Sequence, residues 1–312
     1  MAPFAQTRQS APHGRAVFLQ TLMSEMKGVR MFFSGISDEA GQGIDNQIKA
    51  HRELGWTHLE LRMIDGQNLT MLPDAAFDAV FDKVTAAGMK VSCFASAIAN
   101  WARPITCDPN IDVEDLKRAI PRMHRFGTPF IRVMSYPNDK DNPLPEPEWR
   151  REAIRRMKTL AKIAEDGGVT LAHENCSGWG GLSAENSNIL IGEVNSPALK
   201  VVFDTGNPPT YRQNAWEYYQ TVYKDIVYVH IKDARIVDGK EVYTYCGEGD
   251  GCVKEIVGDL LAKGYDGGFS IEPHLAAVIH TGQKADTEQH LYESYVEYGR
   301  RLMRIVEDIR KR

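Results

Sequence analysis

From Met31 onward, short runs rich in β-branched and aromatic residues alternate with longer stretches of helical periodicity, and the alternation occurs eight times in the 312-residue chain. Repeated β–α units of this kind predict a parallel sheet. Eight of them over about 250 residues predict a closed α/β barrel, the (β/α)8 or TIM barrel. A doubly wound open sheet is the alternative architecture. The eight expected strands cover residues 31–37, 57–62, 90–96, 129–136, 169–175, 200–206, 226–233 and 267–273.

The stretches between the expected strands carry apolar residues at helical spacing. Between the second and third strands they recur at i, i+3, i+4 and i+7, the pattern of a helix that packs one face on a sheet: Phe77, Val80, Phe81 and Val84. No change in composition marks a linker, so residues 29–312 are expected to form a single domain. Residues 1–28 lack a strand pattern and are expected to be a flexible N-terminal extension, with a helix packed on the barrel as the alternative.

The positions of glycines support the same division of the chain into strands and helices. Five of them stand just before an expected strand, where the C-terminus of a helix favours a left-handed residue: Gly55, Gly88, Gly127, Gly168 and Gly264. Each of these positions is therefore expected to end a helix.

Composition and charge exclude several classes of protein. The chain is 43% hydrophobic and 25% charged, as soluble globular proteins are. Its net charge of −5 and its pI near 6.0 argue against a nucleic-acid-binding surface, which is usually basic. Five scattered cysteines without a CxxC pair indicate neither a disulfide framework nor a thiolate zinc site. Because no window resembles a membrane span or a signal-peptide core, we expect a cytoplasmic protein without a membrane partner.

Four ionisable residues lie at the ends of consecutive expected strands, the fifth to the eighth: Glu174, Asp204, His230 and Glu272. In a barrel of this kind, catalytic residues come from the C-terminal ends of the strands. Three carboxylates brought together there would repel one another unless a divalent cation neutralised them, and an oxygen-rich ligand set suits Mn²⁺ or Mg²⁺. The alternative for each residue alone is a strand-end charge that is paired or solvated.

The motifs around these residues occur in the order seen in one known superfamily: HEN (173–175), FDTGN (203–207), HIKDA (230–234), GEGDG (247–251) and IEPH (271–274). The sequence resembles the xylose-isomerase-like barrels, in particular the sugar phosphate isomerases and epimerases, with ketose 3-epimerases and inosose dehydratases as relatives. The resemblance implies that Glu174, Asp204, His230 and Glu272 bind a divalent metal. Mn²⁺ is the expected ion, with Mg²⁺, Co²⁺ or Zn²⁺ as alternatives.

In the ketose epimerases the two metal-bound glutamates also exchange protons with the substrate, so the resemblance implies Glu174 and Glu272 as the acid/base pair. The expected activity is that of a sugar isomerase or epimerase acting on a keto-sugar or a derivative. A base removes the proton next to the carbonyl, and a metal-stabilised enediolate forms. Return of the proton to the other face gives an epimer.

Two positions depart from the ketose 3-epimerase pattern. Asn207 stands where those enzymes place a substrate-binding histidine, and Ile236 stands where they place an arginine, although Arg235 is adjacent. The sequence also looks like the large subunit of the C-glycoside deglycosidases, lyases that cleave 3-oxo-C-glycosides by β-elimination from the same kind of intermediate. On that alternative, a small β-rich subunit would be a partner. We also expect a homo-oligomer.

Further residues are candidates for binding a sugar. On strands, alternate residues share a face, so Lys232 lies on the same face as His230, and His274 on the same face as Glu272. Each could serve as an extra acid, base or hydrogen-bond donor. His173 faces away from Glu174. Simple salt-bridging or packing is the alternative for each. The remaining candidates are Glu60, Arg62, Arg132 and Asn207 for hydroxyl groups, Trp101 and Trp179 as an apolar wall, and Glu248, expected to reach inward from a loop over the site. The alternatives are an internal salt-bridge layer for Glu60, Arg62 and Arg132, and ordinary loop packing for the two tryptophans.

Two other functions fit the expected fold less well. A related abasic-site endonuclease would need more histidine ligands and a basic face, which the acidic charge balance opposes. A non-catalytic sugar-binding barrel would leave the complete ligand set without a purpose.

Overall fold

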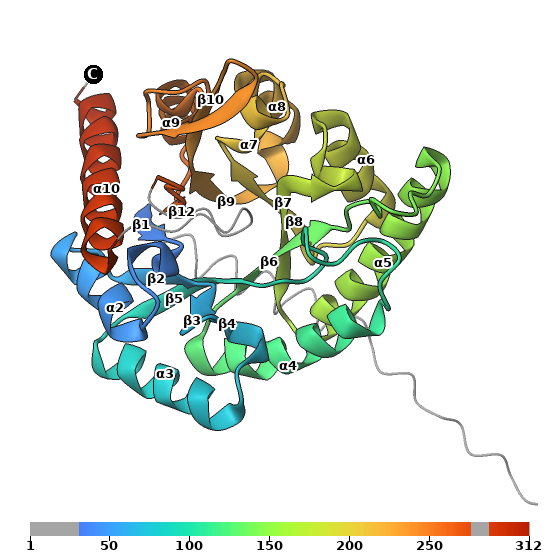
Figure 1. Ribbon diagram of the computed structural model, residues 1–312, viewed down its shortest axis with the longest axis horizontal. Helices are drawn as coiled ribbons and strands as arrows, with labels where there is room; N and C mark the ends of the chain where they lie inside the picture. The colour runs from blue at the N-terminus through green and yellow to red at the C-terminus, as the bar shows by residue number, and fades with distance from the viewer. Residues whose placement is uncertain (1–30, 276–286, 312) are drawn as a thin grey trace, which may run out of the picture. The chain divides into compact units, whose positions relative to one another are not determined.

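The computed structural model describes residues 31–275 and 287–311, and the expected extension of residues 1–28 lies outside the described residues. Eight parallel strands form one sheet in the order β1-β12-β9-β8-β7-β6-β5-β2 (Figure 1). A parallel bridge between Ile36 and Glu60 joins the two ends of this order. The sheet is therefore the (β/α)8 barrel that the sequence predicts. Its strands are β1 (Phe32–Gly35), β2 (His58–Leu61), β5 (Lys90–Ala95), β6 (Phe130–Ser135), β7 (Thr170–Gly178), β8 (Leu199–Asp204), β9 (Ile226–Ile231) and β12 (Gly268–Ile271).

A helix follows each barrel strand, and Figure 1 shows these helices around the outside of the strands. They are α2 (Ile44–Glu53), α3 (Asp74–Ala86), α4 (Asn110–Phe126), α5 (Glu146–Asp166), α6 (Ala184–Val194), α8 (Ala215–Val222), α9 (Val253–Ala262) and α10 (Glu288–Arg310). Shorter elements occupy the connections. They are the hairpins β3 (Met63–Ile64) with β4 (Gln67–Asn68) and β10 (Asp233–Val237) with β11 (Lys240–Thr244), the helix α7 (Asn207–Thr210), and the 3₁₀ helices η1 (Ser37–Ala40), η2 (Leu69–Met71), η3 (Trp179–Gly181) and η4 (Tyr223–Asp225).

Local sequence signals set the boundaries of these elements. All five glycines expected to end a helix have a positive φ; Gly127, for example, has a φ of 67° after α4, and Gly168 has the same φ after α5. At α6, the Ser183 side chain accepts a hydrogen bond from the backbone N–H of Asn186 and caps the helix N-terminus. The chain can therefore leave each helix sharply and enter the next strand.

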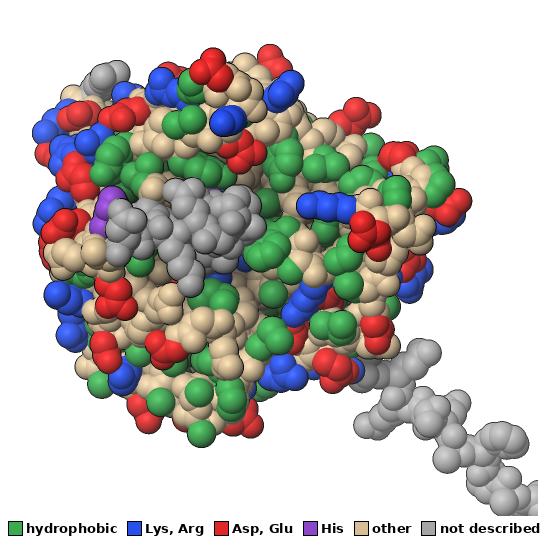
Figure 2. Space-filling view, viewed as in Figure 1, with side chains coloured by type: hydrophobic (Ala, Val, Ile, Leu, Met, Phe, Trp, Pro, Cys, Tyr) green, Lys and Arg blue, Asp and Glu red, His purple; other side chains and the backbone are tan. Residues whose placement is uncertain are grey.

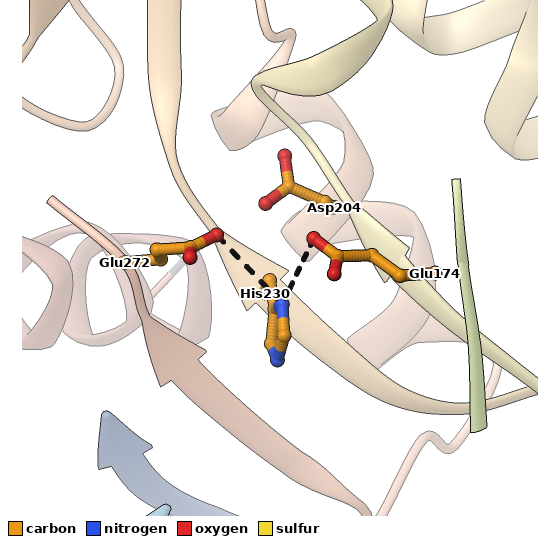
Figure 3. A group of neighbouring side chains, drawn as sticks. All are labelled: Glu174, Asp204, His230 and Glu272. Atoms are coloured by element: carbon orange, nitrogen blue, oxygen red, sulfur yellow. Dashed lines mark ion pairs between the residues drawn. The ribbon is translucent and has the colours of Figure 1, made fainter. Parts of the chain in front are cut away.

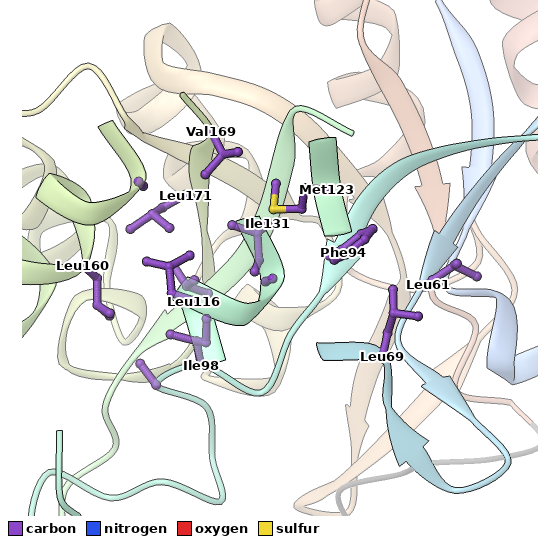
Figure 4. Close-up of a cluster of buried hydrophobic side chains, with 14 of the residues drawn as sticks. Leu61, Leu69, Phe94, Ile98, Leu116, Met123, Ile131, Leu160, Val169 and Leu171 are labelled. Carbon is purple, nitrogen blue, oxygen red and sulfur yellow. The ribbon is translucent and has the colours of Figure 1, made fainter. Parts of the chain in front are cut away.

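Apolar side chains fill the space between the barrel and its helices. In α4, Leu116, Ala119 and Met123 form one buried face, and Ile131 of β6 lies in the same cluster of buried side chains (Figure 4). Burial of a leucine of this size stabilises the fold by roughly 1.5–3 kcal/mol. Among the described residues, no helix is long and apolar enough to cross a membrane.

The interior of the barrel contains a hydrogen-bonded polar layer. The Ser92 hydroxyl of β5 lies 3.0 Å from that of Ser34 in β1 and 2.7 Å from that of Tyr228 in β9. Nearby, the Ser270 hydroxyl donates a 2.6 Å hydrogen bond to Glu60 Oε2. This layer joins strands from different sides of the barrel and holds the Glu60 carboxylate in place.

Candidate active site

The barrel brings together the four residues that the sequence predicts as metal ligands: Glu174, Asp204, His230 and Glu272. They come from four strands that are neighbours in the sheet, β7, β8, β9 and β12, with Glu272 directly after the last of these. Each residue offers one ligand atom, and these atoms lie within 4.8 Å of one another on buried side chains (Figure 3). The closed barrel thus converts four distant sequence positions into one compact group.

Glu60 orients the ring of His230 by contacting its Nε2 atom. Its Nε2 lies 3.1 Å from both carboxylate oxygens of Glu60. Its Nδ1 faces the other way, 3.6 Å from Glu174 Oε1 and 4.0 Å from Glu272 Oε2, and within the described part of the chain this buried atom has no hydrogen-bond partner. Burial lowers the pKa of His230, but the Glu60 and Glu174 carboxylates outweigh burial and raise it well above its usual value. A cation at Nδ1 would therefore replace a proton.

The two carboxylate oxygens of Asp204 have different surroundings, one facing the backbone and the other facing the site. Oδ1 accepts hydrogen bonds of 2.8 Å from the backbone N–H groups of Gly206 and Asn207, at the start of α7. Oδ2 lies 3.0 Å from Lys232 Nζ, yet it is a buried atom without a hydrogen bond from any described residue. Burial raises the pKa of Asp204 to about 6, because the Lys232 ammonium only partly offsets the lost hydration and the two glutamates add to it.

Each glutamate of the group is held by an arginine. Arg132 Nη1 lies 3.1 Å from Glu174 Oε2, and Arg62 Nη1 lies 2.9 Å from Glu272 Oε1. Burial raises the pKa of Glu174, but Arg132 and His230 outweigh burial and lower it to about 2. The pKa of Glu272 likewise falls well below its usual value, because Lys232, His274 and Arg62 together outweigh burial. Both carboxylates are therefore ionised at neutral pH.

This donor set fits a divalent cation. Two of its atoms, His230 Nδ1 and Asp204 Oδ2, are buried without hydrogen bonds from the described residues, and both belong to the group of four ligand atoms. Buried polar atoms are normally hydrogen-bonded, and Asp204 Oδ2 has only its ion pair with Lys232, so two such atoms in one cluster call for an explanation. Three carboxylate oxygens and one imidazole nitrogen are a common ligand set for Mn²⁺, Mg²⁺ or Zn²⁺.

The sequence matches the family of xylose isomerase-like TIM barrels over residues 48–295, which is more than half of the chain. The chain belongs to this family. The resemblance to xylose-isomerase-like barrels is thereby confirmed. Among curated proteins, none matches the sequence.

Three solved structures show how closely other chains share the whole fold. A D-tagatose 3-epimerase-like protein has a TM-score of 0.70 at 17% identity, covering 90% of this chain and 99% of that chain. An IolI protein with a bound zinc atom has a TM-score of 0.69 at 15% identity, with coverage of 90% and 99%. The D-allulose 3-epimerase of Methylomonas sp., in complex with D-allulose, has a TM-score of 0.67 at 15% identity, with coverage of 88% and 97%. At such identities the likeness shows the family's fold.

Several residues predicted to act in catalysis or to bind substrate lie against the four ligands. Lys232 Nζ is 3.0 Å from Glu272 Oε2, and His274 Nε2 is 3.9 Å from Glu272 Oε1. Asn207 donates a 3.2 Å hydrogen bond to Glu174 Oε1. Glu60, Arg62 and Arg132 occupy the contacts described above, so the structure places all six of these residues at the site.

Sequence reasoning missed Asp38 and Glu39 of η1, directly after β1. Arg62 Nε lies 3.1 Å from Asp38 Oδ1, and His274 Nδ1 lies 2.9 Å from Glu39 Oε1. The same rule that found the four ligands, an acid at the end of a barrel strand, would have found these two in the run SDEA. Tyr243 of β11 was also missed; its ring meets His274 edge-on at 5.0 Å. That contact depends on how the β10–β11 hairpin folds back, which strand periodicity does not indicate.

Two predicted site residues are wrong. Glu248 does not reach inward: its side chain is 54% exposed and pairs with Arg301 of α10. Trp179 does not form an apolar wall, because it is only 2% exposed and packs in the core, where its indole N–H donates a 2.8 Å hydrogen bond to Glu146. Trp101 lies on the loop between β5 and α4 with 45% of its surface exposed, and its role as an apolar wall stays a prediction.

The glycine-rich loop around Glu248 folds around the carboxylate of Asp233. The backbone N–H groups of Gly247, Gly249 and Gly251 donate hydrogen bonds of 2.8–2.9 Å to Asp233. A Cβ on Gly249 would collide with that carboxylate, which explains why glycine is needed there. The loop thus fixes Asp233, next to Lys232 at the start of the β10–β11 hairpin.

Proposed function

We propose that the protein is a divalent-metal-dependent sugar isomerase or epimerase that acts on a keto-sugar or a derivative by removing a proton next to a carbonyl. The observation that carries the proposal is the convergence of four ligand atoms within 4.8 Å, two of them buried without hydrogen bonds from the described residues. Glu174, Asp204, His230 and Glu272 would hold the ion, with Mn²⁺ favoured and Mg²⁺, Co²⁺ or Zn²⁺ as alternatives. Such an ion would polarise the carbonyl and its neighbouring hydroxyl, lowering the cost of proton removal.

The contacts of the chain suggest a division of tasks. Arg132 and Arg62 each hold the outer oxygen of one glutamate, which keeps Glu174 and Glu272 ionised and oriented. One ionised glutamate accepts the proton from the substrate carbon, and the other returns a proton to the opposite face after it has itself been protonated. Lys232, 3.0 Å from Glu272 Oε2, is placed to resupply that proton.

The surface of the barrel supports a small-molecule substrate. On the face in Figure 2, Lys and Arg side chains are intermixed with Asp and Glu side chains among the described residues. Exposed ion pairs such as Lys83–Asp45 and Arg125–Asp78 add to this mixture. Interspersed charges with a net charge of −5 do not make the basic field that nucleic acid requires.

A second candidate is a lyase that cleaves 3-oxo-C-glycosides by β-elimination after the same proton removal. The observation that favours it is the loss of two ketose-binding groups. Asn207, at the position of the histidine in ketose 3-epimerases, is tied to Glu174, and Ile236 lies on the β10–β11 hairpin beside an exposed Arg235. On this candidate a small β-rich subunit would be a partner.

Hydrogen exchange in D₂O tests the proposal. The Mn²⁺-loaded protein is incubated with a panel of ketoses and 3-oxo-glycosides and followed by NMR. Deuterium next to the carbonyl together with a new epimer supports the isomerase or epimerase, and aglycone release from the 3-oxo compounds supports the lyase. Absence of both reactions across the panel, with metal bound, would favour a non-catalytic barrel. The matched control is Glu174→Gln, in which exchange should be lost.

A further inference from the structure

A second group of possible metal ligands lies beside the first. Glu39, Glu272 and His274 offer ligand atoms within 4.8 Å of one another, and all three are buried. Glu272 belongs to both groups, so its carboxylate would bridge two neighbouring ions. A shared carboxylate between two cations about 3.5–4 Å apart is the arrangement of two-metal enzymes.

The guanidinium of Arg62 lies among these ligands. Its Nη2 is 3.1 Å from Glu39 Oε1, and its Nη1 is 2.9 Å from Glu272 Oε1. Its third donor, Nε, is 3.1 Å from Asp38 Oδ1. All three guanidinium nitrogens of Arg62 therefore face carboxylates, and the side chain is only 8% exposed.

We propose that Arg62 is a resident cation that takes the place of a second metal ion and keeps the site mononuclear. The inference rests on the proposed function, because it concerns the same site. Arg62 fixes Glu272 Oε1. Glu272 Oε2 lies on the side of the first group, 4.0 Å from His230 Nδ1 and 3.0 Å from Lys232 Nζ, so a single ion there would share this oxygen with Lys232. Arginine suits this role because it stays charged and its fork geometry matches carboxylates.

The charges nearby explain why a cation is required there. Asp38, Glu39 and Glu272 place three buried carboxylates around the guanidinium. Without Arg62 their mutual repulsion would be compensated only in part, and the space left by the side chain would be lined with oxygen ligands that suit Mn²⁺ or Mg²⁺. A fixed arginine at this place instead limits the site to one ion.

Metal stoichiometry tests this role. The full chain is dialysed against Mn²⁺ and analysed by elemental analysis and by electron paramagnetic resonance. Wild type should bind one ion per chain with an uncoupled signal. Arg62→Met, which removes the charge and keeps an unbranched stem, should bind two ions with a spin-coupled signal. Arg62→Met/Glu39→Gln, which also removes a ligand, should return to one.

The matched control is Arg132→Met, which removes the other buried arginine that holds a ligand glutamate. It lies outside the second group and should never bind two ions. If Arg62→Met does not fold alone, it is refolded with excess Mn²⁺; recovery with two ions supports the proposal, and failure to recover overturns it.

The outcomes separate this inference from the proposed function. Wild type that binds two ions, or folded Arg62→Met that binds only one, overturns the role of Arg62 and leaves the first site intact. Wild type that binds no ion overturns the proposed function itself.

Discussion

The carboxylate of Asp204 serves the fold and the proposed metal site at the same time. Oδ1 accepts two backbone hydrogen bonds that start α7, whereas Oδ2 faces the group of ligands. Because Oδ1 is fixed by the backbone, the direction of Oδ2 does not depend on the metal. A residue placed in this way is a preorganised ligand, which reduces the cost of ordering the site.

Asp204→Asn tests this division at the residue scale. The amide oxygen can still accept the two backbone hydrogen bonds, but a neutral amide replaces the anionic ligand. Calorimetric titration should show Mn²⁺ affinity reduced by more than about 100-fold, while the melting temperature of the metal-free protein changes by only a few degrees. The control is Asp225→Asn, a partly exposed partner of Lys200; equal losses of affinity in both variants would contradict the assignment.

The residues of the site were predictable only where strand periodicity places a side chain. Glu174, Asp204, His230 and Glu272 follow from their positions in apolar strands, and they do converge. Glu248 and Trp179 lie in connections between barrel strands and helices, and the direction of these connections depends on tertiary partners such as Arg301 and Glu146. Sequence alone does not indicate those partners.

At the scale of elements, α4 shows how the barrel gains its stability. Leu116 is fully buried, whereas Ile111 on the same helix is 47% exposed. Leu116→Ala should lower the free energy of unfolding by about 2–5 kcal/mol, through lost burial and the cavity left behind. Ile111→Ala should change it by less than about 1 kcal/mol. Urea unfolding measures both, and a similar cost for the two variants would show that this face of α4 does not carry the packing.

A buried histidine joins helices that are distant in sequence. In α2, His51 Nδ1 lies 2.7 Å from the backbone carbonyl of His58, and Nε2 lies 2.8 Å from the Tyr295 hydroxyl of α10. Burial lowers the pKa of His51 from its usual 6.5 to about 3. As the pH falls, His51 therefore becomes protonated near pH 6.5 in the unfolded chain but only near pH 3 in the folded protein.

This difference predicts how stability depends on pH. As pH falls from about 6.5 toward 3, His51 should lower the free energy of unfolding by up to about 1.4 kcal/mol per pH unit. His51→Gln does not titrate, so its unfolding curves between pH 6.5 and 4 should show a weaker dependence on pH. Exposed His290→Gln is the control and should follow wild type. An identical dependence in wild type and His51→Gln would refute the assignment.

The elements themselves were largely predictable. Each expected strand overlaps an observed one, with ends that differ by a few residues at most; the strand expected over 169–175, for example, is Thr170–Gly178. The reason is that parallel barrel strands are apolar runs with helical stretches between them. The β10–β11 hairpin was not predicted as a hairpin, because its first strand follows β9 almost without a break.

At the scale of the whole molecule, the barrel closes around a cluster of buried charges. Burying several carboxylates costs free energy unless cations pair with them. Arg62, Arg132 and Lys232 provide part of that compensation. A divalent ion would add to it, so metal binding and folding should be linked.

Metal addition should therefore stabilise the entire chain. At a free Mn²⁺ concentration of one hundred times the dissociation constant, the free energy of unfolding should increase by about 2.7 kcal/mol, and chelation should reverse the increase. The double variant Asp204→Ala/His230→Ala should show no increase. Differential scanning calorimetry measures all three, and an equal metal-dependent shift in the double variant would locate the stabilising ion elsewhere.

The most direct test of the metal site is anomalous X-ray diffraction from crystals of the Mn²⁺-loaded protein. We predict a single manganese peak enclosed by Glu174, Asp204, His230 and Glu272, within about 2.4 Å of His230 Nδ1 and Asp204 Oδ2. A fully loaded crystal with no peak there, or with its peak at another group of residues, would contradict the account.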